Sequence, residues 1–227
     1  MSKSFSFRKN FRLCILAVWL FSFCTTVYAE SLLESKKTAV KKLKNCSFKS
    51  VYPQFSPKNS SYSAGARKIN RMLKKEFLNI SAHFSESECE PEEKEGFYTL
   101  ETDYFLKRNS RIVSILYIST GYKKDRPHPN NISKGFSFDA VTGKRISFSD
   151  LIQGQKALNL LQDLIISEIS AMDIPFSEEI RKKEYDFYIT ESGVSFINLF
   201  QIHALQSVEA EIPFHRLEKI LNVDKIR

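Results

Sequence analysis

The first 29 residues constrain this chain most, because they separate an export leader from the part that must fold. Four basic residues within the first twelve precede an apolar run over 13–24, and the segment ends in a V-x-A triplet at Ala29. A charged region, an apolar region and a small terminal residue in this order are typical of a secretory signal peptide. We therefore expect cleavage after Ala29 and a periplasmic or secreted protein made of residues 30–227.

Two other interpretations of this N-terminus are less favoured. A permanent membrane anchor needs about 20 mostly apolar residues, but Ser22, Thr25 and Thr26 interrupt the run. A lipoprotein would be modified at Cys24, yet Phe23 stands before it where a small residue is normally required. Since no later segment approaches membrane-spanning length, we expect no transmembrane segment after cleavage.

Removal of the leader leaves a mildly basic chain. The leader holds four of the 34 Lys and Arg residues and none of the 26 Asp and Glu, so the formal charge falls from +8 to +4 over 198 residues. Nucleic-acid-binding proteins usually concentrate basic residues on one face or carry a recognisable motif, and this sequence carries no such motif. We expect no nucleic-acid partner, and a length of 198 residues indicates a single domain.

Two cysteines remain after export, Cys46 and Cys89. A pair of cysteines in an exported protein predicts one disulfide bond, which would stabilise the fold by about 4 kcal/mol in the chain-entropy description. The alternative is two unpaired thiols. No histidine neighbours either cysteine, so we expect no metal site here.

The segment 30–46 is basic and rich in lysine, and we expect it to form a short helix or a solvated tether. After it, Ser63 is a suitable N-cap for a helix with an apolar stripe at three- and four-residue steps. The stripe consists of Ala66, Ile69, Leu73 and Phe77. The opposite side of this helix is basic, which is typical of a solvated face and less often of a partner surface.

The remaining elements are grouped by type along the chain. Strands are expected over 97–106, 112–118, 136–140, 146–148, 187–190, 194–199 and 208–212, with helices after Gly154 and after Pro213. Because strands and helices are segregated and do not alternate regularly, the sequence predicts an α+β fold. We expect a single domain in which an antiparallel sheet packs against two or three helices.

Six short motifs in the C-terminal half occur in a recognisable order. They lie at 112–115, 128–130, 138–144, 146–152, 187–194 and 210–217. In order and spacing they resemble a bacterial extracytoplasmic domain of unknown function. That domain forms the outer part of RsiV-type lysozyme-sensing anti-sigma factors and precedes the catalytic domain of PdaC-type peptidoglycan deacetylases. The resemblance covers 47–221 and implies a stand-alone module, preceded by the leader (1–29) and the basic segment (30–46).

Sequence motifs of catalysis are missing. The chain contains no G-x-S-x-G, S-x-x-K, H-E-x-x-H or Walker motif and no Gly-rich dinucleotide fingerprint, and its four histidines show no ligand spacing. We therefore expect no cofactor, no metal and no enzymatic activity. The resemblance implies binding loops, for which the candidate residues are Arg126, His128, Asn130, Phe200 and His203. The chain departs from the family pattern in both loops, near 125–127 and 200–206.

Two functions remain open from the sequence. The first is an exported envelope binding module that recognises a protein such as lysozyme, or a cell-wall glycan. The second is a small cell-wall hydrolase that uses His128 with Asp125 or Asp139 for acid–base chemistry.

Overall fold

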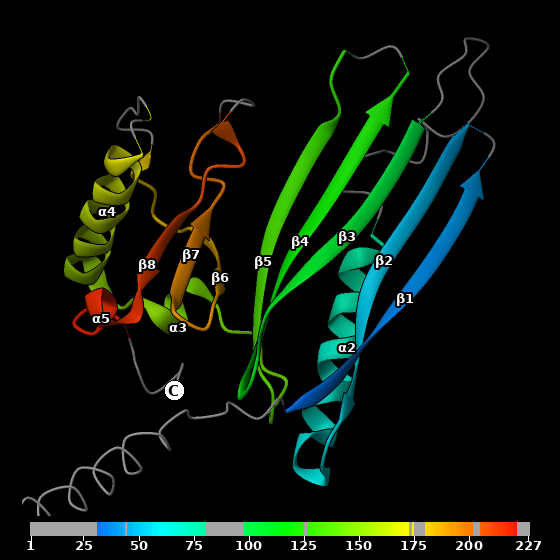
Figure 1. Ribbon diagram of the computed structural model, residues 1–227, viewed down its shortest axis with the longest axis horizontal. Coiled ribbons are helices and arrows are strands. Elements are labelled where there is room, and N and C mark those ends of the chain that lie inside the picture. Colours follow the sequence, from blue (N-terminus) through cyan, green and yellow to red (C-terminus); the bar gives the residue numbers. More distant parts are fainter. Residues whose placement is uncertain are drawn as a thin grey trace, which may run out of the picture.

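The structure, a computed structural model, describes residues 31–43, 45–79, 98–124, 127–172, 174, 180–201 and 205–221. They form a five-stranded sheet in the order β1-β2-β3-β4-β5 and a three-stranded sheet in the order β6-β7-β8, with four α-helices (Figure 1). This confirms the predicted α+β class and single domain. Within these residues, no helix combines the length and the hydrophobicity that a membrane crossing requires.

The lysine-rich N-terminal segment is a strand, so the expectation of a helix or tether is wrong. β1 (Leu32–Leu43) pairs with β2 (Cys46–Pro57) in antiparallel register along its whole length. Leu32 is fully buried, which anchors the beginning of the strand. Lysines on an edge strand discourage pairing with other chains. The basic segment 30–46 is therefore largely part of the sheet and does not precede it as a separate unit.

A crossover helix makes the sheet mixed, where the sequence suggested a wholly antiparallel one. α2 (Ser63–Phe77) carries the chain from β2 back to the start of β3 (Tyr98–Asn109), and β2 and β3 are parallel. Parallel neighbours require such a long connection. The predicted stripe on α2 is confirmed, since its four apolar residues are at most 2% exposed. The cap is earlier than predicted: the Asn59 side chain accepts a hydrogen bond from Ser61 N–H at the preceding 3-10 turn (Ser60–Tyr62).

Aromatic rings hold α2 on the sheet. β4 (Ile112–Lys123) pairs with β3 on one side and β5 (Asn130–Asp139) on the other, both antiparallel. The Phe77 ring meets the Tyr117 ring edge-on at 4.6 Å and the Tyr104 ring at 6.1 Å. Asn70 adds a polar clamp, because its side chain exchanges two 2.8 Å hydrogen bonds with the backbone of Phe55 in β2.

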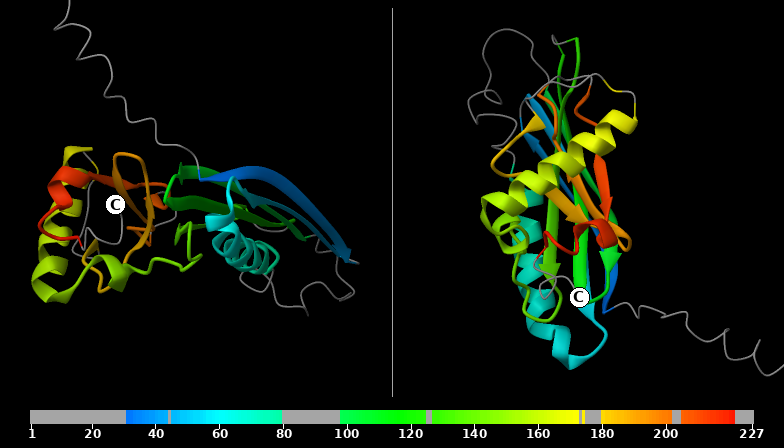
Figure 2. Two further views of the ribbon diagram at one scale, coloured as in Figure 1. Left: turned by 90° about the horizontal axis from the view of Figure 1, so that it is seen from below. Right: turned by 90° about the vertical axis from the view of Figure 1, so that its left-hand side faces the viewer.

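The C-terminal half builds a second layer with its own core (Figure 2). Its elements are α3 (Phe148–Leu151), α4 (Gly154–Ala171), β6 (Asp186–Ile189), β7 (Gly193–Ile197), β8 (Ala210–Pro213) and α5 (Phe214–Leu217). Leu161, Ile165 and Ile169 of α4 are fully buried in the cluster that contains Phe196 and Ile212. The expected strand over 146–148 does not form. A single bridge pairs Phe138 with Arg145 just before it, and Ser147 then caps α3.

β6 joins the two sheets by direct backbone contact with β5. A Cβ atom added to Gly135 would overlap the carbonyl oxygen of Phe187 and lie 3.0 Å from the Tyr188 nitrogen. Next to this contact, the buried Ser114 hydroxyl accepts a hydrogen bond from Ile189 N–H at 2.7 Å and lies 2.8 Å from the Ser137 hydroxyl. Only glycine permits this separation, so residue 135 decides how closely the second layer approaches the first.

A buried arginine closes the other end of the same junction. Arg108 is 8% exposed and donates to the Ser110 hydroxyl at 2.9 Å. Its guanidinium lies 3.7 Å from the Glu191 carboxylate and over the Phe214 ring. A buried charge is stable only when paired and hydrogen-bonded. Arg108 therefore links β3 to the turn between β6 and β7 and to α5.

We predict that Gly135→Ala lowers the free energy of unfolding by about 3 kcal/mol, because the methyl group forces two backbones apart. Gly154→Ala is the control. Its added Cβ would meet no atom within 4 Å, and its φ of +80° adds only left-handed strain, about 1 kcal/mol. Urea denaturation of both variants measures the difference, and an equal loss in the two would refute the close contact.

A second prediction concerns the capping box of α3. The hydroxyl and the backbone N–H of Ser147 donate to the Asp150 carboxylate and lower its pKa to about 2. A depressed carboxylate pKa stabilises the fold above the pKa of the unfolded chain, about 3.9, and this contribution disappears as pH falls toward 2. Asp150→Asn should cost about 1 kcal/mol at pH 7 and flatten the stability profile between pH 4 and 2. Glu218→Gln, at an exposed site, should leave that profile as in the wild type.

Candidate functional site

One part of the five-stranded sheet is covered by none of the elements that the structure describes. Ser50 of β2 donates a hydrogen bond to the Phe77 carbonyl of α2, so the side chains on either side of it in sequence, Lys49 and Val51, lie on the opposite face. We call this the far face. β6 contacts β3, β4 and β5 and covers the far face near Ser114 and Leu116. The remainder is uncovered by any described element.

Strand register arranges this remainder in rows. In one row Lys49 is opposite Glu101, which is opposite Thr120 on β4. In the next row Asp103 is opposite Ile118. Side chains at directly opposite positions lie close together on one face. The far face therefore carries two carboxylates and one ammonium group among hydroxyl and aliphatic side chains.

These rows surround a shallow pocket of about 180 Å³. It is lined by Lys49, Val51, Glu101, Thr102, Asp103, Ile118 and Thr120. We call the six of these that belong to the far face, all except Thr102, the open patch. Asp103 also accepts a hydrogen bond from Tyr104 N–H at 2.8 Å, which fixes its orientation. The open patch thus combines polar groups, among them the hydrogen-bonded Asp103, with aliphatic side chains, as small-ligand and partner sites do.

An aromatic group borders the open patch where β6 begins to cover the sheet. Phe105 is 55% exposed, although it lies within β3 next to the buried Tyr104. The Lys107 ammonium lies 5.5 Å from the Phe105 ring and 4.8 Å from the Tyr188 ring. Burial raises the pKa of Tyr188, and its hydrogen bond to Glu209 raises it further, so the phenol stays neutral. This edge offers an exposed ring and a cation held by aromatic faces.

The predicted loop residues at the opposite end are exposed where the structure describes them. His128 and Asn130 lie at the connection between β4 and β5, and both are exposed. Asn130 is opposite Gly121, one position beyond the row of Thr120. Arg126 and Asp125 lie outside the described residues. The connection that carries His128 therefore borders the open patch at the β4–β5 end of the sheet.

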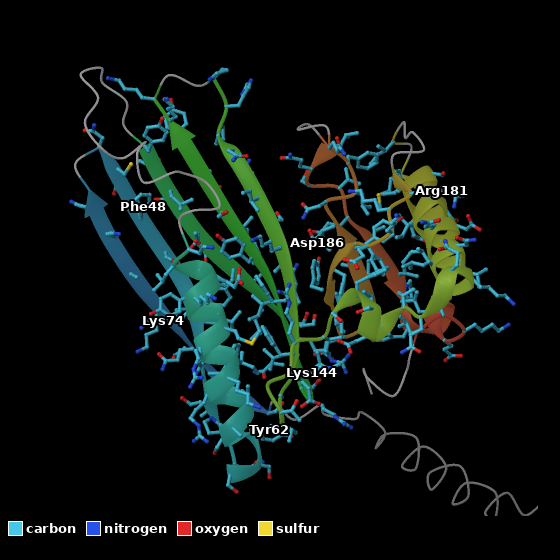
Figure 3. All side chains as sticks on the ribbon, turned by 180° about the vertical axis from the view of Figure 1, so that it is seen from behind. Phe48, Tyr62, Lys74, Lys144, Arg181 and Asp186 are labelled. Atoms are coloured by element: carbon cyan, nitrogen blue, oxygen red, sulfur yellow. The ribbon has the colours of Figure 1, made fainter. Side chains whose placement is uncertain are left out.

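The second predicted loop is tied to the same strand. The Asn198 side chain donates to the Ser133 carbonyl of β5 and to the Asp186 carboxylate, both at 2.9 Å. Figure 3 labels Asp186 on the side of the second layer that faces β5. Asn198 has a φ of 54°, a left-handed conformation that such anchoring stabilises. The segment that leads to Phe200 thus lies beside the β5 edge of the far face.

Phe200 itself is a core residue. Its side chain is 7% exposed and packs in the C-terminal cluster. His203 lies outside the described residues, so its binding role stays a prediction, as do those of Arg126 and His128. Phe200 was predicted to bind a ligand but is buried in the core. An aromatic residue in a loop can take either role, and sequence alone does not separate the two.

The structure separates two residues of the proposed hydrolase set. His128 precedes β5 and Asp139 ends it. The nine residue steps from Asn130 to Asp139 in the extended strand span about 30 Å. Asp139 instead accepts hydrogen bonds from Thr142 N–H (2.7 Å) and the Thr142 hydroxyl (2.9 Å) in a turn. The prediction that His128 and Asp139 act together as an acid–base pair is therefore wrong.

Cys46 begins β2 in a small cluster with Phe48, Tyr98 and Leu100, and it is 1% exposed. Cys89 lies outside the described residues, so the bridge between them stays a prediction. Among the described residues, no three His, Cys, Asp or Glu side chains gather in a way that would hold a metal ion.

The sequence contained a signal for the open patch, but the candidate binding residues were sought in loops. Glu101 and Asp103 alternate with buried residues, which predicted a strand with one wet face. Lys49 joins them only through the parallel register of β2 and β3, and that register depends on a connection of 40 residues. Phe105, an exposed aromatic residue in the same alternation, was the further clue.

Two solved structures share this fold. One is a member of the DUF3298 family from Bacteroides fragilis, with a TM-score of 0.56 and 12% identity over 85% of this chain and 94% of that chain. The other is a DUF3298 family protein from Pseudomonas aeruginosa, with a TM-score of 0.61 and 13% identity over 84% of this chain and 94% of that chain. No protein-family profile matches the sequence, and no curated protein matches it.

At these identities the likeness establishes the fold alone. The α+β architecture is that of DUF3298 proteins, a family of unknown function, which agrees with the predicted class of domain. The closer relation to RsiV-type and PdaC-type proteins stays a prediction.

Proposed function

We propose that this protein is an exported envelope binding module that recognises a lysozyme-like protein or a cell-wall glycan through the open patch. The observation that carries the proposal is the uncovered part of the far face, where Glu101, Asp103 and Lys49 stand together around a pocket. Antiparallel sheets commonly leave one face in water, and such a face is accessible to a partner. Here it presents fixed charged groups beside an exposed aromatic ring.

The chemistry of the open patch suits both ligand classes in different ways. Carboxylates and the Thr120 hydroxyl can accept and donate hydrogen bonds to sugar hydroxyls, and the exposed Phe105 ring can pack against a sugar face. The carboxylates of Glu101 and Asp103 also complement a basic protein surface. A protein partner would cover the open patch together with the connection that carries His128, because they are neighbours on the sheet.

We favour a basic protein over a glycan for one reason. The two carboxylates face one ammonium group in the patch, so its charge is negative while the exported chain as a whole is positive. Local charge of this sign steers a cationic partner to one site and gives the encounter its orientation.

The test is calorimetric titration of the purified protein with lysozyme and, separately, with soluble peptidoglycan fragments. Glu101→Gln combined with Asp103→Asn should weaken lysozyme binding tenfold or more, since two rim charges are removed. Glu184→Gln combined with Glu218→Gln removes the same charge at exposed sites of the second layer and should leave affinity within about twofold. Equal effects of the two pairs, or no binding of either ligand, would contradict the proposal.

The same preparations decide the hydrolase alternative. An enzyme that uses His128 would turn over peptidoglycan or acetylated sugars and lose that turnover in His128→Ala. A binding module shows no turnover in the wild type, and His128→Ala changes affinity alone.

A separate prediction concerns export and the cysteines. The intact mass of the protein recovered from the periplasm or medium should equal residues 30–227 less two hydrogen atoms, because the leader is removed and Cys46 pairs with Cys89. Reduction should restore the two hydrogens, and Cys46→Ser should lower stability by about 2–5 kcal/mol. A mass that includes residues 1–29, or one unchanged by reduction, would refute the corresponding part.

A further inference from the structure

The side of α2 that points away from the sheet is strongly basic. It carries Arg67, Lys68, Arg71, Lys74 and Lys75, all exposed. Two apolar side chains lie among and beside them, Met72 at 36% and Leu78 at 39% exposure. Figure 3 labels Lys74 on this helix. We call these seven residues the basic face.

The cations of the basic face have no ion-pair partner among the residues that the structure describes, and Glu76 is the only acidic residue within α2. Arg67 and Arg71 are four residues apart, as are Arg71 and Lys75. Like charges at this spacing destabilise a helix. The arrangement therefore costs stability unless an anionic partner is present.

β1 extends the positive charge on the same side of the sheet. Ser50 faces α2 and is opposite Ala39 in the β1–β2 pairing. Lys37 and Lys41 are two positions away from Ala39 on either side, so they project toward the same side. Both are exposed. The positive surface thus continues from the helix onto the adjacent edge strand.

We propose that the basic face binds the surface of an anionic phospholipid membrane. Several separate cations spread along an exposed helix face suit a field of lipid headgroups better than one shaped ligand. Met72 and Leu78 favour the same partner, since exposed apolar side chains among cations gain from the headgroup–acyl boundary. A soluble polyanion offers them no such environment.

This binding would orient the molecule. α2 and the far face lie on opposite sides of the five-stranded sheet, so contact through the basic face leaves the open patch directed away from the membrane. The inference does not depend on the function proposed for the open patch.

The test is sedimentation of the processed form with vesicles of phosphatidylglycerol and with vesicles of phosphatidylcholine. Arg71→Gln combined with Lys75→Gln should lower partitioning onto phosphatidylglycerol about 25-fold, since each cation near the surface contributes about fivefold. Lys183→Gln combined with Lys219→Gln removes equal charge from exposed sites of the second layer and should change partitioning less than twofold. Circular dichroism checks that both variants are folded.

A third variant separates a membrane from a soluble polyanion. Met72→Ser should weaken partitioning onto phosphatidylglycerol a few fold and leave retention on polyphosphate unchanged. The proposal is overturned by any of three results: no preference for phosphatidylglycerol, equal losses in the two double variants, or an affinity for polyphosphate that matches or exceeds that for vesicles.

Discussion

The backbone contact between β5 and β6 at Gly135 is the constraint on which the rest of the structure depends. It brings the C-terminal layer against the far face, where the Ser114 hydroxyl accepts a hydrogen bond from Ile189 N–H and Arg108 pairs with Glu191. Because β6 is only four residues long, it covers the far face over a short stretch of β3, β4 and β5. The open patch exists because the covering strand is shorter than the three strands beneath it.

The parts of this fold that follow local rules could be predicted from sequence. The stripe on α2 and the apolar positions of α4 alternate with helical periodicity, and each becomes one side of a core. β1 could not be found in this way, because a lysine-rich sequence is typical of a solvated tether. Its strand conformation depends on pairing with twelve residues of β2. Edge strands are paired on one side alone and are often protected by lysine, so they lack the usual apolar signal.

Long-range register explains what sequence reasoning missed in the candidate site. Glu101 and Asp103 belong to a recognisable wet strand face, whereas Lys49 meets them only because α2 returns the chain in parallel to β2. His128 and Asp139 looked compatible as an acid–base pair at eleven residues of separation. An extended β5 places them at opposite ends of a strand, and no local pattern distinguishes that outcome from a loop that folds back.

The formal charge of +4 over residues 30–227 conceals a separation of charge across one sheet. The outward side of α2 holds five cations, while the pocket on the far face holds two carboxylates and one ammonium group. α2, about 10 Å across with its side chains, lies between the basic face and the sheet. The two charged groups are therefore more than one Debye length apart at physiological salt, and each surface acts on its own partner with little interference. Composition reports only the sum of the charges on the two surfaces. Only the alternation of side chains across the strands shows that one chain presents opposite charges in opposite directions.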